Sequence, residues 1–393
     1  MRLLVVTHNY PRFAGDPAGV YVARLASAVA ARGVDVRVVA PNAPGVTGGT
    51  DGVPVTRFRY APRSLERVGY RGDVRWRRLL APGMVLSIPP YLMAFQRAVA
   101  RAIREFRPQA IHAHWWLPAG WVSVRANVPV VVTCHGSDVR LLERSRVLRR
   151  LGARVLRQAA MVTTVSEFLS RDLRDLVGDP RPAVTVTPMP LDIDLFRRGA
   201  TVGKTDPPTI LYAGNLVAAK GVDVLIDAFA KVRRAGLPCR LRILGEGPDA
   251  ERLNAVAVAA GVGGAVEWSP FIPQTSMPEE YGRATITVLP SRGKAEGLGL
   301  SLVEAVLAGS AVVGTPAGGI PEVIEDGVTG LLTRDGDPDD LAAKLECLLG
   351  DPDLRQSLTD AGAARAREKH AADSVADQFL ALYDNAAHNH VVR

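Results

Sequence analysis

Short apolar runs alternate with longer amphipathic segments along the whole chain, and this alternation most constrains the fold. The run Leu3–Thr7 has the length of a buried strand, and Val20–Arg32 after it has apolar residues at helical spacing. Strands that alternate with helices in this way are typical of parallel sheets with crossover helices. The sequence therefore predicts an α/β fold built from doubly wound sheets.

The alternation runs through two halves, which are separated by one irregular segment. Residues Arg197 to Pro208 are polar, rich in Gly and Pro and without apolar periodicity. A chain of 393 residues also exceeds what one core usually organises. We predict an N-terminal Rossmann-like domain over 1–198, to which a helix at about 370–393 returns, and a C-terminal Rossmann-like domain over 207–369. Ligands are expected in a central cleft, which the carboxyl ends of the strands face.

The expected strands and helices follow from these patterns. The strands are expected at 3–7, 35–40, 53–58, 110–113, 130–133, 161–165, 184–187, 210–213, 240–244, 266–268, 285–289, 311–314 and 330–332. The main helices are expected at 20–32, 91–106, 146–159, 222–234, 249–260, 302–308 and 338–349, with an almost continuous helical pattern over 354–387.

Several classes of protein are not expected. The longest apolar region, around Leu79 to Phe95, contains prolines and falls short of the ~20 residues that a bilayer span needs. The apolar stretch at the N-terminus is too short for a signal peptide. The three cysteines, Cys134, Cys239 and Cys347, are odd in number and far apart, so neither a disulfide framework nor a metal cluster is expected. A cytoplasmic location fits best, with peripheral contact at the inner membrane face left open.

The net charge of +8 is concentrated in two arginine clusters. Such surfaces could bind anionic lipid headgroups, a phosphorylated acceptor or nucleic acid, or they could be ordinary solvated helix faces. No recognised nucleic-acid motif accompanies the charge, so nucleic acid is not expected as a partner. The first cluster is Arg57, Arg59, Arg63, Arg67, Arg71, Arg75, Arg77 and Arg78, offset by Glu66 and Asp73, and the second is the seven arginines between Arg140 and Arg157.

The segment from Pro290 to Ala305 is the most informative for chemistry. An expected strand ends near Pro290, a glycine-rich loop follows, and a helix begins near Leu300. Backbone amides at such a helix start form a site for a phosphate, and the carboxylates of Glu296 and Glu304 suit the hydroxyls of a sugar and a ribose. The combination suggests a nucleotide sugar. Ser301 and Glu304 also match a capping box, which would give Glu304 a structural role instead.

Three further residues follow expected strands and could contact the same ligand. Lys220 precedes an expected helix and could neutralise a diphosphate, although surface lysines are common. His135 could orient a sugar hydroxyl or an acceptor, or it could be a packed loop histidine. Gly19 could let the backbone approach a phosphate, or it could serve a tight turn. Asp192-Ile193-Asp194 resembles a metal motif but lies away from the phosphate loop, and we interpret it as incidental.

Taken together, these residues resemble the retaining enzymes of glycosyltransferase family 4, which have the two-domain GT-B fold. The segment Glu296-x7-Glu304 with Gly297-Leu298-Gly299 is the most specific part of the resemblance, which spans nearly the whole chain. By this resemblance Glu304 holds the ribose, Glu296 contacts the donor sugar, and Lys220 binds the diphosphate.

The resemblance implies further roles in the donor site. Main chain at Leu298, Gly299 and Leu300 would lie along the donor, His135 beside its sugar, Gly19 near the phosphate, and Phe271 and Ile272 along the base. One position departs from the family: Asn215 stands where an arginine commonly accompanies the lysine. Either another arginine substitutes, or Lys220 and backbone amides bind the diphosphate without it.

The resemblance implies transfer of a hexose from a UDP- or GDP-type sugar to a hydroxyl acceptor with retention of configuration, without a metal or other cofactor. His135, Glu296 and Lys220 are the expected catalytic residues. The early segments look like those of bacterial enzymes that build envelope polysaccharides or decorate natural products. The alternatives are a nucleotide-sugar epimerase of the same architecture and a non-catalytic, basic membrane-binding module.

Overall fold

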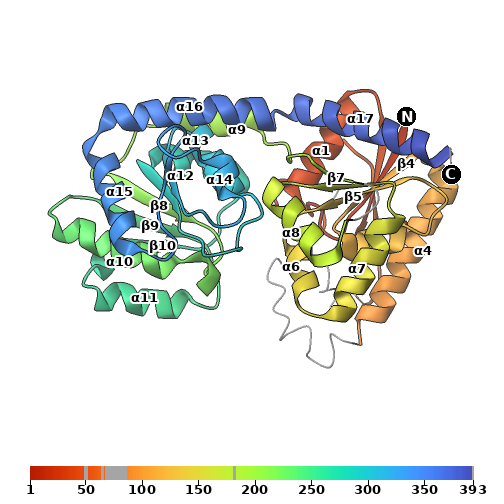
Figure 1. Cartoon of the computed structure of the whole chain (residues 1–393), viewed down its shortest axis with the longest axis horizontal. Helices are drawn as coiled ribbons and strands as arrows, with labels where there is room; N and C mark the ends of the chain where they lie inside the picture. Colours follow the sequence, from red (N-terminus) through yellow and green to blue (C-terminus); the bar gives the residue numbers. More distant parts are fainter. Residues whose placement is uncertain (48–51, 63–65, 67–85, 180–182, 392–393) are drawn as a thin grey trace. The chain divides into compact units, whose positions relative to one another are not determined.

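The computed structural model describes residues 1–47, 52–62, 66, 86–179 and 183–391, and the chain folds into two compact units (Figure 1). Unit 1 consists of Met1–Pro190 and Ala372–Arg393, and unit 2 consists of Leu191–Ala371. Each has its own parallel sheet with helices between the strands. The expected α/β fold with two doubly wound units is confirmed. The cleft between them stays a prediction.

The sheet of unit 1 has seven parallel strands in the order β3-β2-β1-β4-β5-β6-β7. Val, Leu and Ile dominate its central strands, which are buried on both faces as crossover helices require. Its strands are β1 (Arg2–Val6), β2 (Asp35–Pro41), β3 (Val55–Phe58), β4 (Ala110–His114), β5 (Val130–Cys134), β6 (Met161–Thr164) and β7 (Val184–Val186).

The helices of unit 1 include the last helix of the chain. Helix α17 packs against α1, β4 and β5, and Tyr383 donates or accepts a hydrogen bond with His112 at 2.8 Å. The expected return of the C-terminal helix to the first unit is therefore confirmed. The helices are α1 (Val20–Ala31), α4 (Ile88–Phe106), α5 (Trp121–Ser123), α6 (Ser137–Glu143), α7 (Arg146–Gln158), α8 (Glu167–Val177) and α17 (Ala372–Val391).

The sheet of unit 2 has six parallel strands in the order β10-β9-β8-β11-β12-β13. Its strands are β8 (Thr209–Ala213), β9 (Arg240–Leu244), β10 (Val266–Ser269), β11 (Ile286–Leu289), β12 (Ala311–Gly314) and β13 (Leu331–Leu332). Its helices are α9 (Ile193–Arg197), α10 (Val222–Arg234), α11 (Ala250–Ala259), α12 (Met277–Arg283), α13 (Leu300–Leu307), α14 (Ile320–Val323), α15 (Pro338–Gly350) and α16 (Pro352–His370).

The boundary between the units lies at Pro190, not in the segment 197–208 where the sequence suggested it. Helix α9 already belongs to unit 2, because Phe196 is fully buried there beside Tyr281. Gly199 also packs so closely on the backbone of Pro278 that a Cβ would lie 2.2 Å from its carbonyl oxygen. The polar composition of the segment hid this packing.

The long helical pattern near the C-terminus is two helices rather than one. Helix α16 ends at His370 and α17 begins at Ala372, with Ala371 in an extended conformation between them. The backbone of Leu191 pairs with this break, and its N–H donates to His370 O at 3.0 Å. Across the ranges described, no helix is long and apolar enough to cross a membrane.

Candidate active site

The loops that follow β8 and β11 lie side by side at the carboxyl edge of the unit 2 sheet. These two strands are neighbours, and their crossover helices lead in opposite directions, to β9 and to β12. The N–H of Arg292 donates to Ala219 O at 2.9 Å and ties the two loops together. Ligands of doubly wound sheets bind at such a switch in strand order.

Lys220 and Glu296 form an ion pair across these loops. Lys220 Nζ lies 2.5 Å from Glu296 Oε1, which also accepts a hydrogen bond from Ser291 Oγ at 2.7 Å. The exposed fractions of the two side chains are 19% and 11%. The pair lies just before helix α10, so a cation, a carboxylate and the positive end of a helix occur together. This arrangement suits a ligand that carries both a phosphate and hydroxyl groups.

A third loop, after β12, holds the backbone of Glu296. The N–H of Gly319 donates to Glu296 O at 3.2 Å, and the N–H of Gly318 donates to Gly293 O at 2.9 Å. Gly318 has a φ of +57°, and a Cβ there would lie 1.9 Å from Glu296 O. Only glycine permits this conformation and this approach. The position of Glu296 is therefore fixed by three loops of unit 2.

Helix α13 begins directly after the glycine-rich loop. Leu300 is its first residue, and Gly299 before it has a φ of 90°. Leu298 is 8% exposed and anchors the loop in the core. The amides of this helix start have no acidic side chain in the first turn to satisfy them. Leu302 N–H donates to Gly299 O at 3.0 Å, and the amides at Leu300 and Ser301 can donate to a phosphate or a sugar oxygen.

Glu304 is buried inside α13 and does not cap it. Ser301 lies within the helix, so the capping-box alternative is wrong. The carboxylate of Glu304, 4% exposed, accepts hydrogen bonds from Gln274 Nε2 at 2.8 Å and from Tyr281 Oη at 3.3 Å. These two donors fix the orientation of the buried carboxylate, whose oxygens can accept hydrogen bonds from a diol.

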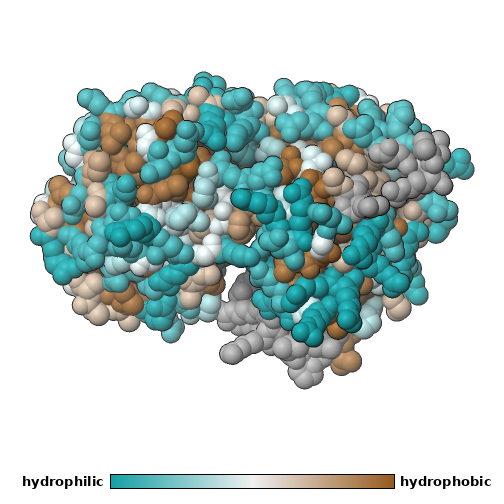
Figure 2. All heavy atoms as spheres, in the orientation of Figure 1, coloured by the Kyte–Doolittle hydropathy of each residue, from teal (hydrophilic) through white to brown (hydrophobic). Residues whose placement is uncertain are grey.

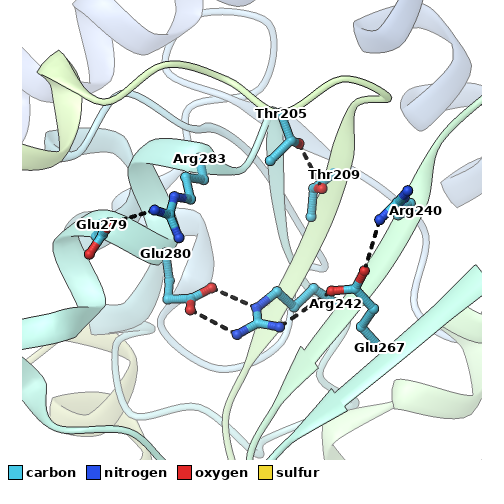
Figure 3. Close-up of polar contacts among 8 residues, drawn as sticks. All are labelled: Thr205, Thr209, Arg240, Arg242, Glu267, Glu279, Glu280 and Arg283. Carbon is cyan, nitrogen blue, oxygen red and sulfur yellow. Dashed lines mark hydrogen bonds and ion pairs between the residues drawn. The ribbon is translucent and has the colours of Figure 1, made fainter.

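Helix α12, which carries Tyr281, is tied to strand β9 by a bidentate ion pair (Figure 3). Arg242 Nε and Nη2 donate to the two oxygens of Glu280 at 2.6 and 2.8 Å. Glu267 on β10 accepts from Arg242 Nη1 at 3.4 Å. Because Glu280 and Tyr281 are adjacent, this pair also holds Tyr281 beside Glu304. Planar, two-point pairs of this kind fix geometry well.

The predicted base-binding residues lie next to the Glu304 cluster in the chain. Phe271 and Ile272 lie between β10 and Gln274, whose side chain bonds Glu304. The side chain of Phe271 is 52% exposed, which is unusual for a large apolar residue. This exposure would suit a ligand ring that stacks on the phenyl face. The contact of Gln274 with Glu304 thus places this loop by α13.

Asn215 is exposed, and its carbonyl oxygen accepts a hydrogen bond from Tyr212 Oη at 2.8 Å. Burial, followed by the charge of Glu296, raises the pKa of Tyr212. The guanidinium next to this loop is that of Arg292, whose Nη1 lies 3.4 Å from Ala218 O and whose Nη2 lies 3.1 Å from Asp223 Oδ2. Arg292 therefore places a guanidinium beside the loop that carries Asn215 and Lys220.

In unit 1, three histidines and Trp115 gather at the carboxyl ends of β1, β4 and β5. His135 Nε2 lies 3.0 Å from His114 Nδ1. The ring of Trp115 lies 4.4 Å from both the His135 and the His8 rings, centroid to centroid. β1 and β4 are neighbours at which the strand order of this sheet reverses. This cluster therefore occupies the expected ligand-binding edge of unit 1.

The histidines of this cluster are neutral at physiological pH. Burial, with a smaller contribution from His8, lowers the pKa of His135 to about 3, and burial lowers the pKa of His8 to about 4. His112 is wholly structural: its ring nitrogens lie 2.8 Å from Tyr383 Oη and 2.7 Å from Thr133 Oγ1. A neutral imidazole can both donate and accept, which suits hydroxyl recognition.

The loop of His135 is held by Asp138. Its Oδ1 accepts from the backbone N–H of His135 at 2.9 Å and of Gly136 at 3.0 Å, and Oδ2 accepts from Trp116 N–H at 3.3 Å. Asp138 is 3% exposed, and burial raises its pKa. The backbone of His135 is thus packed in its loop, as one of the two interpretations expected. Its ring contacts the other members of the cluster.

Gly19 lies beside the same edge, because a Cβ there would lie 2.2 Å from the carbonyl oxygen of Asn9. Its φ of 69° and this contact both require glycine, and helix α1 begins at the next residue. The structure therefore places Gly19 with His135 in unit 1, and the other predicted site residues in unit 2.

Several residues of these clusters had no predicted role. Ser291, Gln274, Tyr281, His8 and Asp138 are ordinary polar residues in sequence, and long-range packing gives them their partners. Position offered one signal, since Ser291, His8 and Asp138 all follow buried strands closely. Asp192 caps α9 through Leu195 N–H at 2.9 Å. No group of three or more potential metal ligands occurs within the described ranges.

Comparison with known families assigns both halves of the chain. The family described as Glycosyltransferase Family 4 matches residues 18–195, and the family described as Glycosyl transferases group 1 matches residues 196–365. The two matches together span both units.

Two of three named relatives match over more than nine tenths of the chain. A D-inositol 3-phosphate glycosyltransferase of Acidothermus cellulolyticus is 31% identical over 95% of this chain and 86% of its own length. A glycogen synthase of Mycobacterium tuberculosis is 28% identical over 93% of this chain and 90% of its own. An alpha-D-kanosaminyltransferase of Streptomyces kanamyceticus is 28% identical over 65% of this chain and 70% of its own.

Solved structures share the fold. A sucrose-phosphate synthase of Thermosynechococcus elongatus matches with a TM-score of 0.77 and 22% identity, over 98% of each chain. The Anabaena protein Alr3699/HepE, in complex with UDP and glucose, matches with a TM-score of 0.73 and 20% identity, over 98% of this chain and 99% of that one. The architecture is thus GT-B, and the family favours transfer over the epimerase and binding-module alternatives. The chain therefore belongs to glycosyltransferase family 4 and is a hexosyltransferase that uses a nucleotide-sugar donor.

Proposed function

We propose that this enzyme transfers a hexose from a UDP- or GDP-sugar to a hydroxyl acceptor with retention of configuration, in glycan, glycolipid or natural-product biosynthesis. The observation that carries the proposal is the Lys220–Glu296 pair, which is held by Ser291 at the switch point of unit 2. UDP is the first nucleotide to test, because Alr3699/HepE, which shares this fold, was solved in complex with UDP.

Each part of the donor has a candidate partner in unit 2. Glu304, held by Gln274 and Tyr281, accepts hydrogen bonds from the ribose hydroxyls, and Phe271 borders the base. Lys220 binds the diphosphate together with the amides at Gly299 and Leu300. Once a phosphate draws Lys220 away, Glu296 is free to accept hydrogen bonds from the sugar hydroxyls.

The proposed reaction needs no external base. The acceptor oxygen bonds to the anomeric carbon on the face from which the nucleotide departs, and the bond from that carbon to the phosphate oxygen breaks. The acceptor proton passes to the departing phosphate oxygen. Lys220 and the helix amides stabilise the negative charge on the leaving group, and neutral His135 orients the sugar or acceptor hydroxyl.

We propose that no metal takes part, because Lys220, Arg292 and two helix starts supply positive charge where a metal would. The acceptor is a hydroxyl compound. D-inositol 3-phosphate is the first to test, because relatives of this chain carry that substrate in their names. Nucleic acid is not proposed as a partner.

The test is a transfer assay in excess chelator, with labelled UDP- and GDP-hexoses and a panel of polyols, polyol phosphates and sugar acceptors. The expected result is release of nucleoside diphosphate that depends on acceptor, and a product whose anomeric configuration by NMR equals that of the donor. An inverted product would overturn the retaining mechanism. Activity that appears only after a divalent metal is restored would overturn metal independence.

A further inference from the structure

Helix α7 of unit 1 carries a concentration of positive charge that the proposed reaction does not use. Its thirteen residues contain five arginines and no acidic residue. None of the five forms an ion pair with any residue that the structure describes. The undescribed stretches contain two acidic residues, Asp51 and Asp73, so they cannot compensate all five charges. The five are Arg146, Arg149, Arg150, Arg154 and Arg157.

The acidic residues near the start of α7 are already engaged. Arg140 on α6 bonds Glu143 at 2.5 Å and contacts Asp172 on α8. These acidic residues therefore do not compensate the charges of the α7 arginines, which can interact with a partner outside the chain. A cluster of like charges held on one helix is electrostatically costly unless an anionic partner offsets it.

Apolar side chains lie among these arginines. A surface hollow is lined by Arg150, Arg154 and Arg157 together with Leu151, Leu176 and Val177. Val147, at the start of the helix, is 71% exposed. In Figure 2 the surface over α7 is mostly hydrophilic, with hydrophobic atoms beside it. Arginines around exposed aliphatic residues are the pattern of a surface that binds anionic headgroups and inserts side chains between them.

We propose that the α7 surface, formed by its five arginines with Val147 and Leu151, docks the enzyme on an anionic phospholipid membrane. The choice over nucleic acid rests on the side chains: α7 has no aromatic residue on which a base could stack, and it has the exposed Val147 and the partly exposed Leu151. Such docking adds to the transferase activity and does not depend on it. It would hold the enzyme where membrane-bound acceptors occur.

The experiment measures binding of the full chain to sedimented vesicles of phosphatidylcholine alone and of equal parts phosphatidylcholine and phosphatidylglycerol. Binding to the anionic vesicles alone is expected, and it should weaken when ionic strength rises from about 0.1 to about 1 M, as the screening length shortens from about 10 to about 3 Å. The double variant Arg150→Glu, Arg154→Glu should bind at least about tenfold more weakly.

Matched variants separate the surface from total charge. Arg233→Glu with Arg234→Glu changes net charge equally on exposed residues of α10 in unit 2, and should bind as the wild type does. Arg150→Lys with Arg154→Lys should also keep binding, whereas Val147→Ser should weaken it. Stabilisation by UDP, measured on every variant, reports folding and the donor site separately, so loss of docking cannot be confused with loss of the transferase site.

Three results would overturn the proposal. The first is equal sedimentation with both kinds of vesicle, or no sedimentation with either. The second is equal loss in the α7 and α10 variants. The third is displacement from anionic vesicles by millimolar inorganic phosphate or by a DNA duplex that binds more tightly, either of which would assign α7 to a small anion or to nucleic acid.

Discussion

Lys220 Nζ lies 2.5 Å from Glu296 Oε1, although 76 positions separate the two residues in the chain. A diphosphate and a sugar are proposed to bind at this pair. A lysine that already has a carboxylate partner is held in position, and a phosphate can replace that partner with little rearrangement of the loops. The proposed donor site is thus largely preformed in unit 2.

Replacing either member of this pair should remove transfer while leaving the fold intact. Glu296→Gln and Lys220→Ala are each expected to lower kcat by roughly 10²- to 10³-fold, as loss of one charge-stabilising group at a reacting centre does. Steady-state kinetics with circular dichroism would measure this. The control is Lys231→Ala, which breaks the ion pair between Lys231 on α10 and the exposed Asp339 on α15 and should leave kcat unchanged. Wild-type turnover in both site variants would reject the assignment.

Glu304→Gln should weaken binding of the nucleoside part of the donor. A charge-assisted hydrogen bond to the ribose becomes a neutral one, so a loss of about 1.5 to 3 kcal/mol, or roughly 10- to 100-fold in affinity, is expected. Calorimetric titration with UDP and with uridine should show the same loss for both. Glu279→Gln, at an exposed position of α12, should change neither. A loss of affinity confined to UDP would indicate that Glu304 acts on the phosphates and not on the ribose.

Arg292 is expected to supply the second positive charge on the diphosphate. Arg292→Ala should weaken UDP by about tenfold and leave uridine unaffected, because the contact is to phosphate alone. Asp223→Asn frees the guanidinium from its 3.1 Å partner and should keep or improve UDP affinity. Unchanged UDP binding in Arg292→Ala would mean that Lys220 and the helix amides bind the diphosphate without an arginine.

His135→Ala should separate binding from transfer. His135 belongs to unit 1 and the nucleotide residues to unit 2, so UDP affinity should stay within about twofold while kcat falls by roughly 10²-fold or more. Initial-rate assays of product formation would measure kcat, and a titration with UDP would measure its affinity. Asp192→Asn, which keeps the cap of α9, should behave as the wild type does. Equal losses in affinity and kcat would indicate a folding defect instead.

Acid should destabilise unit 1 through its buried histidines. Burial, with a smaller contribution from His135, lowers the pKa of His112 to about 3 in the folded chain, from 6.5 when unfolded. Between these values the unfolded chain binds more protons, so stability falls as pH falls below 6.5. At pH 5 His112 alone should cost about 2 kcal/mol. Thermal unfolding from pH 7.5 to 5 should show this slope, and His388→Gln, at an exposed position of α17, should keep it. A flat profile would contradict a lowered pKa of His112 in the folded chain.

Elements with strong periodicity were predictable from sequence. Helix α10 occupies Val222–Arg234 as expected, because its apolar face is regular and a glycine precedes it. Short elements such as α12 were not expected: Met277–Arg283 has little periodicity of its own and is held by the Arg242–Glu280 pair. Long-range pairing of this kind leaves no local signal.

The site could be predicted as a set of residues but not as a set of contacts. Glycine-rich loops after strands indicated Glu296 and Lys220, yet no spacing rule joins them. Trp115 shows the limit most clearly, because its φ of 70° is rare for a large side chain and propensity argues against it.

Two arginines of the first cluster lie within the described residues. Arg57 donates to backbone carbonyls at Tyr10 and Pro11, and Arg59 pairs with Glu66 at 3.4 Å. The members of this cluster that lie outside the described residues are Arg63, Arg67, Arg71, Arg75, Arg77 and Arg78.

The most direct test of the central claim is the shift in unfolding temperature of the full chain, in excess chelator, against UDP, GDP, ADP, TDP and their sugars. A nucleotide at 100 times its dissociation constant should stabilise the folded state by about 2.7 kcal/mol. We expect stabilisation by UDP or GDP that Lys220→Ala abolishes and Lys231→Ala preserves. No stabilisation by any nucleotide, or equal stabilisation of wild type and Lys220→Ala, would contradict a metal-independent donor site at Lys220 and Glu296.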